Sequence, residues 1–264
     1  MEDDSFNIPD FYTEHKGTGT PIVFIHGFTL DARMWDQQFY LLSQSYQCLR
    51  YDMRGYGRSS PLPHKPYSHY IDLHYILEYY KMQPAILVGL SMGGRVALQC
   101  ALEYPGDVKG LVLIDTAIDG YPWSIEYASW VDSFEKILEK EDIIEARKQW
   151  LNGKLFETAM RKPQVAHELR TMLDSFTGFQ WTAADPSYQT PIPSYKRLEE
   201  VDCPVLTLVG EYDLPDFKGC ADVIVTRVKN SEKIIVPSAG HCSNMENPIF
   251  VNKAIQQWLQ QLPT

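Results

Sequence analysis

Ser91 lies between two glycines in the motif G-L-S-M-G at residues 89–93, directly after the apolar run 85–88. Only small neighbours fit where a strand turns sharply into a helix, and G-x-S-x-G at such a turn is typical of a nucleophile elbow. The turn directs the serine hydroxyl away from the sheet, beside a helix N-terminus that stabilises developing negative charge. A glycine-rich turn with a helix-capping serine also fits these five residues, so the prediction depends on their companions.

A serine hydroxyl needs a general base, and the base needs an acid that orients it. The chain offers both in the order serine, acid, base. Asp213 follows the apolar run 204–209, and His241 follows a later run that ends at Val236. Because parallel strands end at one edge of a sheet, residues placed there converge. We therefore predict Ser91 as the nucleophile, Asp213 as the orienting acid and His241 as the general base.

Two other carboxylates compete with Asp213 for the role of the acid. Asp115 follows an apolar run at an alternative acid position, and Asp216 is a weaker third candidate. Asp213 is favoured because it has the fuller motif, G-E-Y-D at 210–213. Taken singly, Asp213 could form only a turn and His241 could cap the next helix. Their order and their placement after strands support a catalytic set.

The reaction also needs an oxyanion hole, in which backbone N–H groups stabilise the negative oxygen of the intermediate. One donor is the residue after the nucleophile, Met92, and the other is expected in the loop after an early strand. The run 21–25 ends in His26-Gly27-Phe28, so we predict the Phe28 N–H as the second donor. Such a donor lowers the barrier by about 3–4 kcal/mol. His26 itself is interpreted as a structural histidine that stabilises this loop.

The strands that must position these residues can be predicted from the apolar residues. These residues form short runs at 21–25, 47–51, 85–88, 110–114, 204–209 and 233–236. Most runs are continuous rather than alternating, as in strands covered on both faces of a parallel sheet. Between or after them, apolar residues recur at helical spacing in 70–77, 94–102 and 250–262. The alternation of strands and helices predicts an α/β fold with a mostly parallel sheet.

The block from 117 to 200 interrupts this alternation. It contains no convincing strand and instead shows helical spacing of apolar residues, as in 130–138 and 165–176. We interpret the block as a helical insertion that folds over one end of the sheet. The predicted organisation is a first core part (1–116), the insertion (117–200) and a second core part (201–264).

Taken together, these motifs resemble those of the α/β-hydrolase superfamily, from residue 21 to the C-terminus. The resemblance rests on H-G-F at 26–28, D-M-R-G-Y-G-R-S at 52–59, G-L-S-M-G-G at 89–94, G-E-Y-D at 210–213 and G-H at 240–241. It implies a mostly parallel central sheet flanked by helices, with the insertion as a helical lid between the sixth and seventh strands. It also implies that 52–59 is a structural loop in which Arg54 pairs with acidic groups.

Two shorter stretches, R-M-W-D at 33–36 and G-E-Y-D-L-P-D-F at 210–217, are similar to those of 3-oxoadipate enol-lactonase-like hydrolases and small carboxylesterases. The segment before Pro21 is short, so the first strands of the family are expected to be reduced to one hairpin or less. Because the nucleophile is a serine, the aspartate-dependent dehalogenase chemistry of related enzymes is not expected.

Aromatic side chains are concentrated in the insertion, and most of them are expected to pack it onto the core. An aromatic cover over a serine site also suggests an apolar acyl or alcohol pocket. We predict substrate contacts for Trp123, Trp130, Phe179 and Trp181. No basic cluster in the insertion is dedicated to a carboxylate, so a neutral ester or lactone is preferred over a dicarboxylate lactone.

The composition narrows the partners and the setting. A formal net charge of −10 over 264 residues disfavours nucleic acid or an anionic membrane surface as a partner. No apolar run approaches the length of a membrane span, and the acidic start does not read as a signal peptide. Five scattered cysteines fit free thiols in a cytoplasmic setting. No metal, nucleotide or flavin motif is recognised, so no cofactor is expected.

The sequence therefore predicts a cofactor-free serine hydrolase that cleaves a small carboxylic ester or lactone through an acyl-enzyme. The same residues could instead serve a C–C bond hydrolase, an amidase-like peptidase or a cofactor-free perhydrolase. A third hypothesis is a lidded small-molecule binding protein with slow hydrolysis. Comparing the turnover of esters, amides and β-diketones separates these hypotheses.

Overall fold

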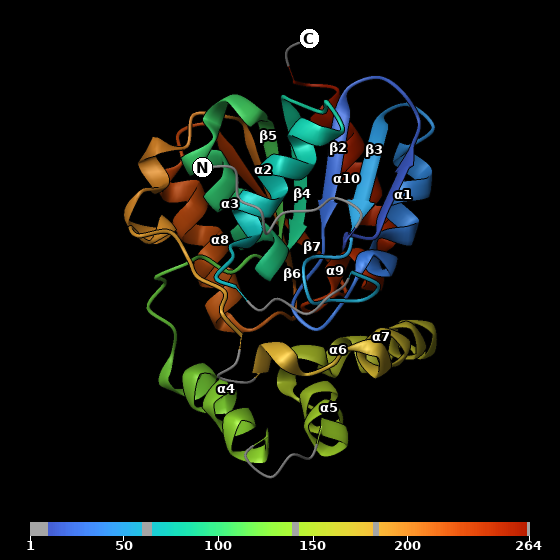
Figure 1. The fold of residues 1–264 in the computed structure, drawn as a ribbon, viewed down its shortest axis with the longest axis vertical. Helices are drawn as coiled ribbons and strands as arrows, with labels where there is room; N and C mark the ends of the chain where they lie inside the picture. The colour runs from blue at the N-terminus through green and yellow to red at the C-terminus, as the bar shows by residue number, and fades with distance from the viewer. Residues whose placement is uncertain (1–9, 60–64, 139–142, 182–184, 263–264) are drawn as a thin grey trace.

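A twisted sheet runs through the centre of the computed structural model, which describes residues 10–59, 65–138, 143–181 and 185–262 (Figure 1). In this part of the chain the sheet has seven strands in the order β1-β3-β2-β4-β5-β6-β7. They are β1 (Thr13–Lys16), β2 (Pro21–Ile25), β3 (Gln47–Tyr51), β4 (Ala85–Leu90), β5 (Val108–Ile114), β6 (Val205–Gly210) and β7 (Ser231–Val236). Only β1 is antiparallel to its described neighbour, so β2 to β7 end at one edge.

All six predicted strands are present, and β1 is a further strand that the apolar pattern did not reveal. Its sequence, T-E-H-K, is polar because β1 is a partly exposed edge strand that pairs only with β3 among the described strands. Since one strand precedes β2 in the described residues, the helical insertion falls between the fifth and sixth strands, β5 and β6. In the count of the described strands, the insertion therefore lies one place earlier than the expected position between the sixth and seventh strands, because only β1 precedes β2 among them.

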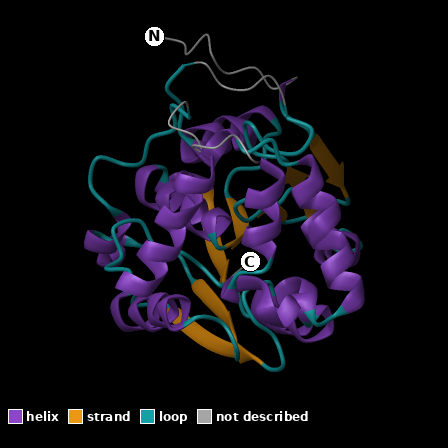
Figure 2. Ribbon diagram, turned by 90° about the horizontal axis from the view of Figure 1, so that it is seen from below, coloured by secondary structure: helices purple, strands orange, loops and turns teal. Residues whose placement is uncertain are grey.

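Helices cover both faces of the sheet (Figure 2). They include α1 (Asp36–Leu42), α2 (His69–Tyr79), α3 (Met92–Glu103), α8 (Pro215–Arg227), α9 (Ser243–Glu246) and α10 (Pro248–Leu259). α2 and α3 pack together on one face, and α1 and α10 pack together on the other. Every residue of β4 and β6 is buried, as expected for strands covered on both sides. No helix in the described ranges combines the length and the apolar character needed to cross a bilayer.

Between β5 and β6, the described residues include four α-helices below the carboxyl-end edge of the sheet (Figure 1). They are α4 (Ile125–Leu138), α5 (Ile143–Leu151), α6 (Glu157–Met160) and α7 (Pro163–Ser175), and they are called the inserted helices below. In α7 the buried residues include Val165, Leu169 and Met172, the helical spacing that the sequence shows. The inserted helices therefore present apolar faces toward the sheet edge, where the predicted catalytic residues lie.

The loop at 52–59 follows β3 at the edge of the sheet where the parallel strands end. Asp52 anchors it, because its carboxylate accepts the Ala32 N–H and the Arg58 N–H at 2.8 Å each. Arg54 donates from Nε and Nη2 to the Asp72 carboxylate at 2.9 and 2.6 Å. The predicted pairing of Arg54 with an acidic group is thus confirmed.

Candidate active site

Ser91 forms the sharp turn that the sequence predicts between β4 and α3. Its φ of 52° and ψ of −112° lie outside the regions that a residue with a Cβ prefers. Hydrogen bonds hold the turn in place: the Ser91 N–H donates to the Ile114 carbonyl at 2.9 Å, and the Ser91 carbonyl accepts from Arg95 and Ala117. Strained backbone that the surroundings hold in this way is typical of functional positions.

The glycines around the serine are required by close packing. A Cβ on Gly89 would overlap the backbone of Gly93. A Cβ on Gly93 would overlap the carbonyl oxygen of Ile25, at the end of β2. A Cβ on Gly94 would overlap the hydroxyl of Thr116, just beyond β5. The elbow can therefore form only because α3 approaches the strands without side chains in between.

We expect Gly93→Ala to lower the free energy of unfolding by about 3 kcal/mol, the upper range for overpacking. The cost is high because a backbone oxygen stands where the new Cβ must go. Urea titration followed by circular dichroism measures the change. Gly106→Ala is the matched control, since no atom lies within 4 Å of its added Cβ. Equal stabilities for the two variants would show that the elbow is not tightly packed.

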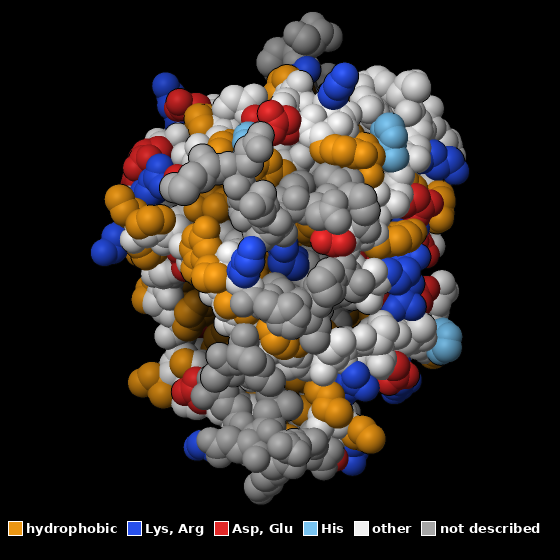
Figure 3. Space-filling model, in the orientation of Figure 1, with side chains coloured by type: hydrophobic (Ala, Val, Ile, Leu, Met, Phe, Trp, Pro, Cys, Tyr) orange, Lys and Arg blue, Asp and Glu red, His pale blue; other side chains and the backbone are white. Residues whose placement is uncertain are grey.

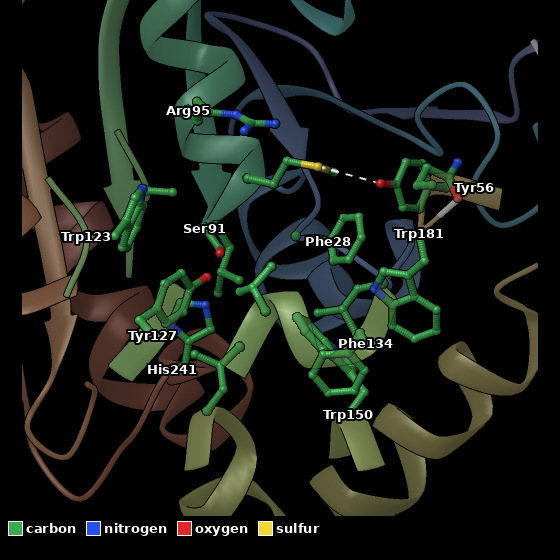
Figure 4. Close-up of a pocket in the computed structure, with 18 of the residues that line it drawn as sticks. Phe28, Tyr56, Ser91, Arg95, Trp123, Tyr127, Phe134, Trp150, Trp181 and His241 are labelled. Atoms are coloured by element: carbon green, nitrogen blue, oxygen red, sulfur yellow. Dashed lines mark hydrogen bonds between the residues drawn. The ribbon is translucent and has the colours of Figure 1, made fainter. Parts of the chain in front are cut away.

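His241 and Asp213 meet where β7 and β6 end. Nδ1 of His241 lies 3.1 Å from each carboxylate oxygen of Asp213, and both residues are buried. A carboxylate only accepts, so Nδ1 carries the proton and Nε2 of the neutral ring remains an acceptor. The Phe217 ring packs on the imidazole with 4.1 Å between centroids, which restrains the imidazole plane. Ser91 and His241 line the same cavity (Figure 4).

The two alternative acids have other partners. The Asp115 carboxylate accepts the N–H groups of Gly210 at 2.7 Å and Ser243 at 3.0 Å, and so ties the end of β6 to α9. Burial raises the pKa of Asp115 well above its ordinary range. Asp216 accepts the N–H and the hydroxyl of Ser124, which precedes α4. In the described part of the chain neither carboxylate hydrogen-bonds to the imidazole.

A buried carboxylate holds the loop that carries His241. Glu246 accepts the N–H groups of Gly240 at 3.0 Å and Cys242 at 3.1 Å, on either side of the histidine. Lys162, at the start of α7, donates to two backbone carbonyls of the same region at 2.7 Å each. The loop is therefore fixed both from the core and from the inserted helices.

Phe28 and Met92, the predicted oxyanion-hole residues, both line the cavity. Within the described ranges, the Phe28 N–H donates to no backbone acceptor. His26, just before, is fixed by two hydrogen bonds: Nδ1 donates to the Gly27 carbonyl at 2.8 Å, and Nε2 accepts the Met53 N–H at 2.9 Å. Both ring nitrogens of His26 are thus occupied in holding the loop, which fits the structural role that the sequence suggests.

The cavity has a volume of about 930 Å³ and lies between the sheet edge and the inserted helices. The space-filling view shows the surface hollowed at this boundary, with hydrophobic side chains in the recess (Figure 3). Aromatic rings form one wall, since the Phe28 ring lies 5.6 Å from Trp150 and 6.2 Å from Trp181. Nε1 of Trp150 also donates to the Thr29 hydroxyl at 2.9 Å. This bond links the inserted helices to the loop after β2.

Two of the four predicted substrate contacts lie on the cavity wall. Trp123 and Trp181 line the cavity, whereas Trp130 and Phe179, both within the described residues, do not. Trp130 instead stacks on Trp150, with 4.8 Å between ring centroids and 17° between ring planes. It therefore supports a wall residue rather than facing the cavity.

The cavity contains a cation that the sequence pattern did not predict. No basic side chain was expected for a carboxylate in the insertion, but Arg95, on α3, lines the cavity. The signal was its spacing, because Arg95 follows Ser91 by four residues and lies on the same side of the helix. Burial lowers the pKa of Arg95, yet a guanidinium remains charged. His69 of α2 and Gln180 also line the cavity and were likewise missed.

We expect His69 to make stability depend on pH. Burial, assisted by repulsion from Arg95, lowers the pKa of His69 to about 3. Between pH 6.5 and about 3 the unfolded chain binds the extra proton, so stability falls as the pH is lowered, by up to about 1.4 kcal/mol per pH unit for this ring. Urea titrations at pH 7 and pH 5 measure how much the free energy of unfolding falls between the two pH values. This fall should be about 2 kcal/mol smaller in His69→Phe than in wild type. An identical pH dependence in both would contradict this, and His15→Phe, on the exposed edge strand, is the control.

Comparison with known proteins places the chain in a family. The model of the alpha/beta hydrolase fold family matches residues 20–248, so the chain belongs to the α/β-hydrolase family, as the motifs predict. A protein of Bacillus subtilis (strain 168) is 31% identical over 94% of this chain and 93% of its own length. Its name assigns it provisionally as a 2-succinyl-6-hydroxy-2,4-cyclohexadiene-1-carboxylate synthase.

Solved structures give the same fold. A thermophilic esterase from Thermogutta terrifontis, solved with malate bound, is 28% identical, with a TM-score of 0.81 over 96% of this chain and 94% of its own. The enol-lactonase from Burkholderia xenovorans LB400 is 22% identical, with a TM-score of 0.78 over 95% and 96% of the two chains, and shows a shared fold. The family is that of the α/β hydrolases, and relatives of this chain are named as a hydrolase and an esterase. The chain is therefore a hydrolase with this fold.

Proposed function

We propose that this chain is a cofactor-free serine hydrolase that cleaves a small carboxylic ester or lactone through an acyl-enzyme intermediate. The observation that carries the proposal is the buried His241–Asp213 pair at the sheet edge where a strained Ser91 lines the same cavity. Nucleophile, base and orienting acid are the three groups that acyl transfer to a serine requires. Trp123 and Trp181 would contact the substrate.

In the proposed reaction, Nε2 of His241 takes the hydroxyl proton as Ser91 attacks the carbonyl carbon. The N–H groups of Phe28 and Met92 donate to the oxyanion that forms. The imidazolium returns the proton to the leaving alkoxide, which departs as an alcohol and leaves the acyl group on the serine. Water then loses a proton to Nε2 and attacks the acyl carbon. The imidazolium returns this proton to the serine oxygen as the bond to the acyl group breaks, which releases the carboxylic acid and restores Ser91. Asp213 stabilises the imidazolium in both halves.

Cavity and relatives support a small substrate. A volume of about 930 Å³ lies within the usual range for small-molecule sites. The Thermogutta protein is an esterase solved with malate, and the name of the Bacillus relative contains a carboxylate. The substrates proposed for this chain therefore include esters that carry a carboxylate.

The experiment that tests the proposal is hydrolysis of p-nitrophenyl esters from acetyl to octanoyl. Wild type should release p-nitrophenol, and the chain length with the highest kcat/KM measures the acyl space under the inserted helices. Absence of turnover over the whole series would contradict ester cleavage. Amides and β-diketones are then the substrates that separate an amidase or a C–C bond hydrolase from a binding protein.

The thiols support a reducing, cytoplasmic setting as part of this proposal. Cys48, Cys100, Cys220 and Cys242 are buried as free thiols, and Cys203 is partly buried. Burial raises the pKa of Cys48 to about 12 and that of Cys203 to about 11. The thiolate forms of both are therefore rare near neutral pH, and the two thiols are expected to be chemically quiet.

A further inference from the structure

One region of the cavity lining carries polar atoms without protein partners. Among the described residues, Nε of Arg95, Nδ1 of His69 and Oε1 of Gln180 are buried and lack a hydrogen-bond partner. All three residues line the cavity. Buried polar atoms are nearly always hydrogen-bonded to protein, water or a ligand. Three unpartnered atoms on one lining therefore offer hydrogen-bonding positions for a bound group.

These atoms lie around Tyr56 and the start of α3. The His69 ring lies 6.0 Å from the Tyr56 ring, and the Tyr56 hydroxyl lies 3.6 Å from the sulfur of Met92. Nε2 of Gln180 donates to the Gly55 carbonyl at 2.9 Å, which leaves Oε1 of the same amide as an acceptor without a partner. In Figure 4 the Arg95 side chain lies on one side of the serine and His241 on the other. The polar region is therefore separate from the proposed catalytic base.

Arg95 has no ion-pair partner within the described ranges. Asp119 is the carboxylate that attracts it most, but no salt bridge joins them, and Oδ2 of Asp119 is itself unpartnered. Asp185 also lines the cavity, yet its oxygens accept from Tyr67 and from Ser187. Asp132, the remaining carboxylate on the lining, is exposed to solvent. The half-buried guanidinium is thus the charge that the lining leaves without a close partner.

We propose that Arg95 binds a carboxylate of the substrate and that Gln180 and His69 bind a hydroxyl beside it. The favoured substrates are then esters or lactones whose acyl part carries a second, ionised carboxyl group. This inference rests on the proposed function, because it names the substrate class of the same site. The chemistry matches the atoms: a guanidinium donates to carboxylate oxygens, and Oε1 of Gln180 requires a donor such as a hydroxyl.

The spacing along α3 sets the length of such a substrate. Arg95 follows Ser91 by four positions, which corresponds to about 6 Å along the helix axis. A carbonyl held at the serine and a carboxylate held at the arginine are therefore separated by a few carbon atoms, as in a succinate or glutarate half-ester. An ester of the same length without the second carboxylate leaves the half-buried guanidinium unpaired.

Calorimetric binding to Ser91→Ala tests the proposal without turnover. Two proteins are compared, Ser91→Ala and the double variant that also carries Arg95→Gln. The ligands are monomethyl glutarate, monomethyl 3-hydroxyglutarate and the neutral methyl valerate. We expect Arg95→Gln to weaken the two anionic ligands by about 10- to 100-fold, the range for a hydrogen bond to a charged group. Methyl valerate should bind equally in both backgrounds. Arg95→Lys should restore part of the anion affinity, and Arg170→Gln, on the exposed side of α7, is the control.

Two further readouts keep the test decisive. Gln180→Glu leaves Arg95 in place and adds a negative charge, so it should weaken the anionic ligands even if Arg95→Gln folds poorly. Gln180→Met should remove any advantage of the 3-hydroxy compound. Equal affinities for charged and neutral ligands in the parent and in Arg95→Gln would overturn the proposal and assign the unpartnered atoms to water. Hydrolysis of neutral p-nitrophenyl esters by wild type would stand in that case, so the two failures are distinguishable.

Discussion

Ser91→Ala should reduce ester turnover by about ten-thousandfold or more, as loss of a nucleophilic serine does in triad hydrolases. The alanine should fold as wild type, because the serine side chain caps no N–H group of α3. Initial rates with the best p-nitrophenyl ester and a thermal melt of the same samples measure both effects. Ser187→Ala is the control, since Ser187 is a second serine on the cavity lining and should not abolish turnover.

Ser91→Gly should lack activity as well, but it should be more stable than Ser91→Ala by about 1 kcal/mol. A residue with a Cβ is strained at φ 52° and ψ −112°, whereas glycine adopts these angles freely. This gain exceeds the extra entropy that glycine gives to the unfolded chain. Equal stability of the two variants would show that the elbow stores no strain, and turnover by either would contradict the proposed mechanism.

Asp213→Asn should lower kcat by about 10⁴-fold, the effect of the same change in serine proteases. The reason lies in the hydrogen bonds of the carboxylate. Oδ1 of Asp213 accepts the Leu214 N–H at 2.7 Å, so the asparagine must keep its oxygen there. Its amide then replaces Oδ2 beside Nδ1 of His241 and favours the tautomer that carries the proton on Nε2. A ring protonated at Nε2 cannot accept the proton of Ser91.

Asp115→Asn is the matched comparison, because Asp115 is the alternative acid. Its two oxygens accept backbone N–H groups from Gly210 and Ser243. An asparagine places a donor against one of them, so we expect a loss of stability of about 1–3 kcal/mol. Steady-state kinetics and urea titration of both variants separate the roles. A larger fall in kcat for folded Asp115→Asn than for Asp213→Asn would reverse the assignment.

Local sequence patterns predicted the parts of the site that local backbone determines. The residues around Ser91 must be glycines because they closely approach residues a few positions away and the neighbouring strand ends. The elbow could therefore be inferred from 89–94 alone. Asp213 and His241 could be placed because each follows a parallel strand, and such strands end at one edge. The distance between the two side chains depends on packing, including the Phe217 ring, and only the structure gives it.

Positions that depend on long-range packing could not be predicted in the same way. Trp130 and Trp181 are both aromatic residues of the insertion, but which ring faces the cavity depends on how α4 meets Trp150. Arg95 reads as an ordinary residue of an amphipathic helix until a cavity forms above α3. Strand β1 was missed because its polar residues carry no apolar pattern, and only pairing with β3 makes it a strand.

The most direct test of the central claim is to trap the acyl-enzyme. Wild type is mixed with its best p-nitrophenyl ester, quenched with acid within one turnover and digested, and the peptides are analysed by mass spectrometry. The proposed mechanism predicts one acyl group on the peptide that contains Ser91, absent in Ser91→Ala and enriched in His241→Gln if that variant acylates. Rapid ester hydrolysis with no acylated peptide, or with the acyl group on another residue, would contradict it.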